Sequence, residues 1–302
     1  EVTGVVLADE DVTKNGGVWS YYNTQYWFPD HTYYFAALSP IGGNWTATPA
    51  TVTADAIKGL GTVAFENANG TEDLLYAKAK VSTPQDNATL ANQGMDPVNM
   101  HFQHLLSKVK FTFLNGFATE NVTVKVSEVA MTAPESATIN LAQTTYNWES
   151  HAGEISLAFG ATEVLDAATS GVAADDRLTI PAPATQIYNV SFKVEVYQSG
   201  KLAMTEHKSA VIKGLALEMG KAYNFSAVID PTTLGLYAIE FPATVVDWAT
   251  PEVEHNIGYY LDSNNGNYVV TSEQGLQAIV EDINAGELPA NTDIVLNDDI
   301  DL

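Results

Sequence analysis

Two groups of residues have types and spacing that could bind a metal ion. His101 and His104 stand three apart, a spacing that would place both imidazoles on one face of a helix. A zinc site needs a third ligand on a rigid element, and no His-Glu-x-x-His pattern accompanies the pair. Asp262 and Asn264 lie in a Gly-containing stretch that resembles a calcium loop but lacks the third ligand. We interpret the histidines as surface or hydrogen-bonded groups, retain Asp262 and Asn264 as a weak calcium candidate, and expect no metal or other cofactor.

Residues that carry catalysis are scarce in this sequence. It has no cysteine, no Gly-x-Ser-x-Gly nucleophile elbow and no glycine-rich phosphate loop. Its 37 acidic residues offer many carboxylate pairs, so their abundance is no evidence for the specific pair that a glycoside hydrolase needs. We therefore expect a protein that is not an enzyme.

The charge balance excludes another class of protein. The 302 residues include 13 Lys plus Arg against 37 Asp plus Glu, which gives a net charge of −24. This charge repels phosphate backbones, so we expect no nucleic-acid partner. Only 17% of the residues are charged, so hydroxyl and amide groups dominate the polar residues. Such a surface with a diffuse negative bias suits a protein exposed outside the cell.

An aromatic cluster near the start of the chain is the best candidate for a ligand site. It contains Trp19, Tyr22, Tyr26 and Trp27. Exposed aromatic rings can stack on the rings of sugars. The alternative is that these rings belong to the core and rim of a β-sandwich, because aromatic residues favour strands.

These candidate residues must be positioned by strands, because most of the chain follows a period of two. Apolar and polar residues alternate in several segments of five to eight residues, and other short apolar runs lie between turn residues. The clearest examples are residues 33–38, 109–114, 122–126, 190–197 and 222–229. Repeated short strands between turns predict β-sandwich domains.

Breaks in this pattern predict the domain boundaries. Residues 82–100 are rich in Pro, Ala, Asn and Gln, which places a first boundary near residue 98. Residues 249–266 form a second linker. Behind it, Thr271-Ser272-Glu273-Gln274 resembles a capping box, followed by an apolar helix face with Ile279 and Ile283. The chain stops just after the apolar run 294–296, so we expect that more sequence follows in the parent protein.

Several segments together resemble the fimbrillin family, the surface-fimbria subunits of anaerobic gut and oral Gram-negative bacteria. The resemblance covers roughly residues 4–248, and it depends on the order and spacing of many short segments rather than on one motif. The matching segments are Gly17-Val18-Trp19, Tyr26-Trp27-Phe28-Pro29, 33–40, Asp73-Leu74-Leu75-Tyr76-Ala77, 102–111, Ile180-Pro181, 214–223 and Val246-Asp247-Trp248.

This resemblance implies an all-β fold of two tandem transthyretin-like Greek-key β-sandwich domains, residues 1–98 and 99–248. Residues 267–302 then start an additional module, whose segments resemble the entry to a surface β-helix domain. The resemblance also implies export as an outer-membrane lipoprotein, whose N-terminal anchor is lost here, since the chain begins at Glu1 and lacks a signal segment. An early strand of the first domain is then missing.

Our first hypothesis is a non-enzymatic fimbrial subunit or tip adhesin at the cell surface. It would assemble with other fimbrial subunits by addition of a donor strand, as the family does, and bind a host or bacterial surface protein or glycan. The appended residues after 248 favour a tip-type or stand-alone adhesin. One alternative is an outer-surface glycan-binding module. Another is a display stalk for a β-helix enzyme or adhesin that lies beyond residue 302.

Overall fold

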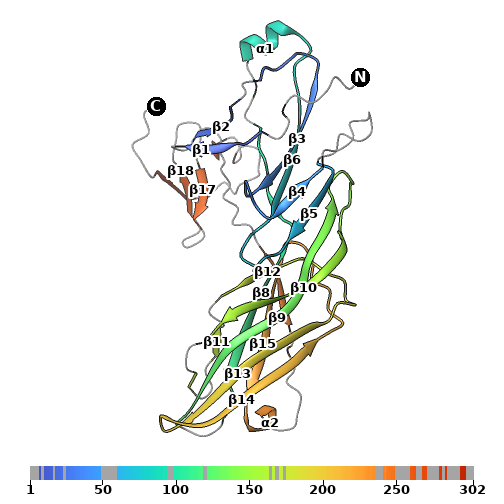
Figure 1. Cartoon of the computed structure of the whole chain (residues 1–302). Helices are drawn as coiled ribbons and strands as arrows, with labels where there is room; N and C mark the ends of the chain where they lie inside the picture. The colour runs from blue at the N-terminus through green and yellow to red at the C-terminus, as the bar shows by residue number, and fades with distance from the viewer. Residues whose placement is uncertain are drawn as a thin grey trace. The chain divides into compact units, whose positions relative to one another are not determined.

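The chain divides into two compact units, Glu1–Trp248 and Ala249–Leu302. The structure is a computed structural model, and Figure 1 shows its helices and strands. It describes residues 7, 10–15, 18–22, 25–48, 60–93, 95, 98–117, 121–162, 165–166, 170–172, 175–234, 241, 243–248, 259–262, 267–270, 279–280, 283 and 293–296.

The first unit is built almost entirely of strands. In chain order these are β1 (Thr13–Asn15), β2 (Val18–Ser20), β3 (Thr32–Ser39), β4 (Trp45–Ala47), β5 (Thr62–Glu66), β6 (Leu75–Ser82), β7 (Gln103–His104), β8 (Ser107–Asn115), β9 (Val122–Asn140), β10 (Trp148–Gly160), β11 (Ser170–Val172), β12 (Arg177–Thr179), β13 (Tyr188–Gln198), β14 (Lys201–Ile212), β15 (Lys221–Ile229) and β16 (Ala243–Asp247). The short helices α1 (Asn87–Gln93) and α2 (Pro231–Leu234) follow β6 and β15.

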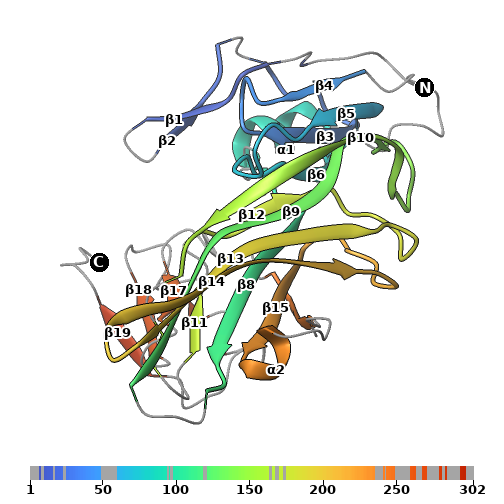
Figure 2. The ribbon, with the colours of Figure 1, turned by 60° about the horizontal axis from the view of Figure 1, so that its bottom comes forward.

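Strand β9 organises the first unit. Met131 pairs with Leu157 of β10 and with Val190 of β13, so these two strands lie on opposite edges of β9. Near its other end, Ile139 pairs with β10 and β5 in the same way. One edge of β9 therefore carries β10, and the other carries β13 and then β5. Figure 2 shows β13 between β9 and β14, and the sheet runs in the order β14-β13-β9-β5-β4.

Two smaller sheets pack on this large sheet and complete two sandwiches. Strands β8 and β15 pair in parallel, with β16 beyond β15 and β11 and β12 on the outer edge of β8. Strands β3, β6 and β7 form a separate antiparallel sheet. The strand pattern thus confirms an all-β sandwich fold, whereas Greek-key connectivity stays a prediction.

Each sandwich has its own core. The phenylalanine core lies between the large sheet and the β8–β15 sheet; its buried residues include Phe111, Phe113, Phe159, Phe192 and Phe225. The tryptophan core lies between the β5 end of the large sheet and the β3–β6–β7 sheet; its buried residues include Phe65, Tyr76, Leu105, Ile139 and Trp148. Because β9 and β10 contribute side chains to both cores, the long strands connect them.

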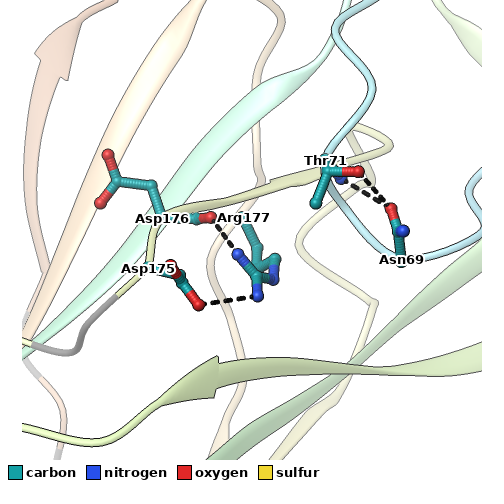
Figure 3. A network of polar contacts seen from close by, with 5 residues as sticks. All are labelled: Asn69, Thr71, Asp175, Asp176 and Arg177. Carbon is teal, nitrogen blue, oxygen red and sulfur yellow. Dashed lines mark hydrogen bonds and ion pairs between the residues drawn. The ribbon is translucent and has the colours of Figure 1, made fainter.

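The turn after β5 makes a second connection, through hydrogen bonds to Leu178 of β12. The Asn67 side-chain amide donates to the carbonyl of Leu178 at 3.0 Å, and the Leu178 N–H donates to the Gly70 carbonyl at 2.8 Å. Gly70 has a φ of 73°, and a Cβ there would lie 3.0 Å from the Leu178 oxygen, so the turn requires glycine. Figure 3 shows the adjoining polar groups, where the Arg177 guanidinium contacts the Asp175 carboxylate at 3.0 Å.

The period-two segments are confirmed as β3, β8, β13 and β15, and as the first part of β9. Helix α1 is a finding that the sequence interpretation of this stretch as linker missed. The Asp86 carboxylate caps it, because it accepts hydrogen bonds from the Thr89 N–H and hydroxyl at 2.7 Å each. These bonds lower the pKa of Asp86. The compact first unit spans both expected domains, so the boundary at residue 98 stays a prediction.

The second unit is described only in part. β17 (Tyr259–Asp262) pairs antiparallel with β18 (Asn267–Val270), and β18 pairs in parallel with β19 (Ile294–Leu296). Between them Ile279, Val280 and Ile283 are helical, and Ile279 is fully buried. The capping box at 271–274 lies outside the described residues. A β-helix-like module that starts at residue 267 stays a prediction.

Candidate functional site

The candidate site is an exposed loop, residues 26–31, that leads into β3 and that we call the aromatic loop. Tyr26 is 76% exposed and Phe28 is 60% exposed. Trp27 between them is half-buried, because its ring packs edge-on against Tyr33 with centroids 4.8 Å apart and lies 6.0 Å from Phe35. Solvent-exposed aromatic rings such as these are available for contact with a ligand.

Hydrogen bonds hold the aromatic loop against the end of β6. The Thr83 hydroxyl donates to the Phe28 carbonyl at 2.6 Å and accepts the His31 N–H at 3.0 Å. The Thr83 N–H donates to the His31 carbonyl at 2.9 Å, and the Asp30 N–H donates to the Pro84 carbonyl at 2.7 Å. Thr83 is only 8% exposed, so these bonds are shielded from water. The exposed rings are therefore carried by an ordered loop.

His31 presents one hydrogen-bond acceptor beside the Phe28 ring. Its Nδ1 lies 2.6 Å from the Pro29 carbonyl, which can only accept, so Nδ1 carries the proton. In the neutral imidazole Nε2 is then an acceptor, and no described residue bonds to it. The His31 ring lies 6.0 Å from the Phe28 ring and 6.2 Å from the Tyr33 ring. Tyr33 closes the loop, since its hydroxyl accepts the Phe28 N–H at 2.9 Å.

We predict that Thr83→Val will loosen the aromatic loop. Valine keeps the shape of threonine but leaves the His31 N–H and the Phe28 carbonyl without their partner, at a local cost of about 1–3 kcal/mol. Hydrogen exchange at the His31 amide should become faster by about fivefold or more. Thr83→Ser keeps the hydroxyl and should exchange as the native chain does. Equal exchange in all three proteins would show that Thr83 does not hold the loop.

The residues that the sequence selected are only partly brought together. Tyr22 is 92% exposed, and its N–H donates to a Glu10 carboxylate oxygen at 2.8 Å. Among the described side chains, no ring contact joins Tyr22 or Tyr26 to Trp27. Trp19 lies in β2, and its side chain is outside the described part of the chain. Ligand binding by Trp19, Tyr22, Tyr26 and Trp27 as one cluster therefore stays a prediction.

The sequence interpretation missed Asp30 and His31 as members of the loop. The available signal was the Pro29-Asp30 pair, which is typical of a turn. Asp30 adopts a φ of 55°, the left-handed conformation that aspartate tolerates better than most residues. Its carboxylate is exposed and has no ion-pair partner among the described residues.

The histidine pair of the sequence is not arranged on one helix face. His104 lies in the extended strand β7, so the spacing does not place the two imidazoles on one helix face. Its ring stacks on Trp248 at 3.7 Å, with Nδ1 2.8 Å from an Asp73 oxygen, whereas His101 is exposed. Within the described ranges, no group of three or more His, Asp or Glu could hold a metal ion. Asp262 ends β17, Asn264 lies outside the described residues, and the calcium site stays a prediction.

A second surface feature is an open edge of the tryptophan core. Strands β3 and β4 are the last strands of their sheets, and residues 40–44 connect them. Among the described residues no strand pairs with the outer edge of either one. Ala36 and Leu38 of β3 and Trp45 and Ala47 of β4 pack against this core but remain only partly buried. The arrangement leaves backbone donors and acceptors beside apolar side chains.

Fold and site together define a β-sandwich protein with an exposed aromatic loop and an open sheet edge in its described part. The model of the fimbrillin-like family matches residues 2–248, and the chain belongs to this family. Family membership supports a role in fimbrial adhesion and implies a location at the cell surface. No described helix has the length and apolar character needed to cross a membrane.

Solved structures share the fold at low sequence identity. A fimbrial protein from Bacteroides vulgatus is 14% identical, with a TM-score of 0.55 over 81% of this chain and 86% of that chain. A candidate cell adhesion protein from Bacteroides ovatus is 16% identical, with a TM-score of 0.44 over 78% of this chain and 77% of that one. No curated protein matched the chain. The first of these similarities confirms the fold.

Proposed function

We propose that this protein is a non-enzymatic fimbrial subunit or tip adhesin that joins other fimbrial subunits by accepting a donor strand along β3. The observation that carries this proposal is the open edge of the tryptophan core. An added strand would pair with the free backbone groups of β3 and would cover the partly buried Ala36 and Leu38. The eight residues Thr32–Ser39 offer a ladder of ordinary strand length.

The phenylalanine core supports this choice of edge by contrast. Its central residues Phe111, Phe113 and Phe225 are fully buried by strands of the same chain. Its edge strand β16 contributes one partly buried residue to this core, Ala243, whereas β3 contributes two to the tryptophan core. Another edge strand of that sandwich, β14, carries Lys201, Glu206 and Lys208, charges that discourage edge pairing. The donor strand is therefore expected at β3 rather than at β14.

In a protein with a role in fimbrial adhesion, strand addition would join the subunit to its neighbours in the fimbria. A solved structure with a related fold is described as a fimbrial protein from Bacteroides vulgatus. We place the protein on the outer surface, attached through an N-terminal lipid anchor. Its partners are other fimbrial subunits and a surface protein or glycan of a host or bacterial cell.

A single engineered cysteine tests the proposed edge, because the native chain contains none. We predict that Ala36→Cys will react with a maleimide in the purified monomer. In fimbriae collected from cells that express the same variant, we expect labelling to slow by at least about tenfold, because the donor strand covers this position. The measurement is the fraction of labelled protein against time, by mass spectrometry.

Met204→Cys is the matched control. Met204 is 44% exposed on β14, away from the proposed groove, so this variant should label equally in monomer and fimbriae. Equal labelling of Ala36→Cys in both states, or failure of the chain to enter any high-mass assembly, would contradict the proposal.

A further inference from the structure

We propose that the aromatic loop is a binding site for neutral, hydroxyl-rich glycans, centred on Phe28, Asp30 and His31. The proposal goes beyond assembly by strand addition and does not depend on it. It also differs from the cluster that the sequence suggested, because it combines the exposed rings of the loop with two polar acceptors instead of four aromatic side chains.

The first argument is the apolar surface. Phe28 is 60% exposed although its backbone is fixed at both polar groups, by Tyr33 at the N–H and by Thr83 at the carbonyl. A backbone that is ordered before binding loses little conformational entropy when a ligand covers the ring that it carries. The C–H face of a pyranose ring is a flat apolar surface of comparable size. Tyr26, 76% exposed, adds a second ring two residues away.

The second argument is the hydrogen-bonding character of the residues two and three positions after Phe28. Asp30 contributes a carboxylate with acceptor oxygens only, and His31 Nε2 is an acceptor in the neutral tautomer that the Pro29 contact selects. A ligand that satisfies the acceptors of these two consecutive residues must be rich in donors. Adjacent hydroxyls of a sugar meet this need, and a carboxylate forms charge-assisted bonds that are roughly twice as strong as neutral ones.

The third argument is electrostatic: negative charge at the loop disfavours the binding of anionic glycans. The chain carries a net charge of −24, and Asp30 adds a negative charge inside the loop. Lys80, which lies 5.7 Å from the Tyr34 ring, is on the other face of β3, because Tyr33 and Tyr34 point to opposite sides of the strand. Among the described residues no cation contacts Phe28, Asp30 or His31. Sialylated and sulfated sugars should therefore bind less well than their neutral counterparts.

The experiment titrates the whole chain with cellobiose, mannobiose, N-acetyllactosamine and lactose, and with 3′-sialyllactose as the anionic comparator. Binding is measured by calorimetry and by intrinsic fluorescence. We expect at least one neutral probe to bind, and lactose to bind no more weakly than 3′-sialyllactose. Phe28→Ala should weaken the best probe by about tenfold, which corresponds to the loss of one aromatic contact.

Two further variants separate recognition from folding. Asp30→Asn keeps size and tolerates the left-handed conformation, so it should fold normally and still weaken binding by about three- to tenfold. Leu202→Ala removes a similarly exposed apolar side chain on β14, outside the loop, and should leave the affinity unchanged. Far-UV circular dichroism checks each variant.

Three results would overturn the proposal. These are the absence of binding by every neutral probe, unchanged affinity of Phe28→Ala and Asp30→Asn, and preferential binding of 3′-sialyllactose. Self-association of the native chain that Phe28→Ala abolishes, without glycan binding, would assign the loop to a protein contact instead. Phe28→Ala should still enter fimbriae, so failure of the glycan site and failure of strand addition are distinguishable.

Discussion

Phe111→Ala is expected to lower the free energy of unfolding by about 3–5 kcal/mol, the usual loss for a phenylalanine removed from a packed core. Phe111 is fully buried at the centre of the phenylalanine core. Its ring lies 4.8 Å from Phe159, 5.4 Å from Phe241 and 5.5 Å from Phe225, so truncation removes several aromatic contacts at once. For a unit of this size, we expect the thermal midpoint to fall by about 6–20 °C.

Calorimetry or circular dichroism measures this loss, with Leu202→Ala as the control. Leu202 is 55% exposed on β14, so its truncation should cost less than about 1 kcal/mol. A loss for Phe111→Ala that is as small as the control would mean that the phenylalanine core is not closed in solution.

The strands of this core could be predicted from the sequence because each has one buried face. In β8, buried and half-exposed residues alternate without interruption from Ser107 to Asn115. A strict period of two in the burial of side chains produces the same period in the sequence. The prediction therefore succeeded where a single strand faces a single core.

The full length of β9 could not be predicted in this way. Its second half contains Pro134, which usually indicates the end of a strand or an edge. On one edge of β9, however, β13 ends its pairing at Met131 and β5 begins at Ser136. Pro134 falls in this gap, where no ladder hydrogen bond on that edge is interrupted. Only the three-dimensional pairing reveals why the proline is tolerated.

The candidate site was predictable in composition but not in geometry. Aromatic residues at 26–28 pointed to this loop, yet the bonds that fix it join His31 and Phe28 to Thr83, which lies 52 and 55 residues away. Contacts over such separations leave no local pattern in one sequence. For the same reason the role of Asp30 became visible only with its backbone conformation.

The second large prediction is that Trp148→Ala will destabilise both halves of the first unit together. Trp148 begins β10, in the part of the chain assigned to the second expected domain, but its ring is buried in the tryptophan core beside Phe65. Its indole N–H donates to the Leu105 carbonyl at 2.7 Å. Truncation removes this bond and leaves a large cavity, so we expect a loss of about 3–5 kcal/mol.

The number of unfolding transitions provides the stronger test. Because β9 and β10 supply residues to both cores, Trp148→Ala and Phe111→Ala should shift the same single calorimetric transition of residues 1–248. Trp148→Phe is the matched control: it keeps a ring but leaves the Leu105 carbonyl without its donor, at a cost of about 1–3 kcal/mol.

Two resolved transitions, each moved by only one of the alanine variants, would instead establish independent folding domains on either side of residue 98. A common transition would mean that a donor strand bound at β3 stabilises the phenylalanine core as well, because ligand binding stabilises every part of a cooperative unit.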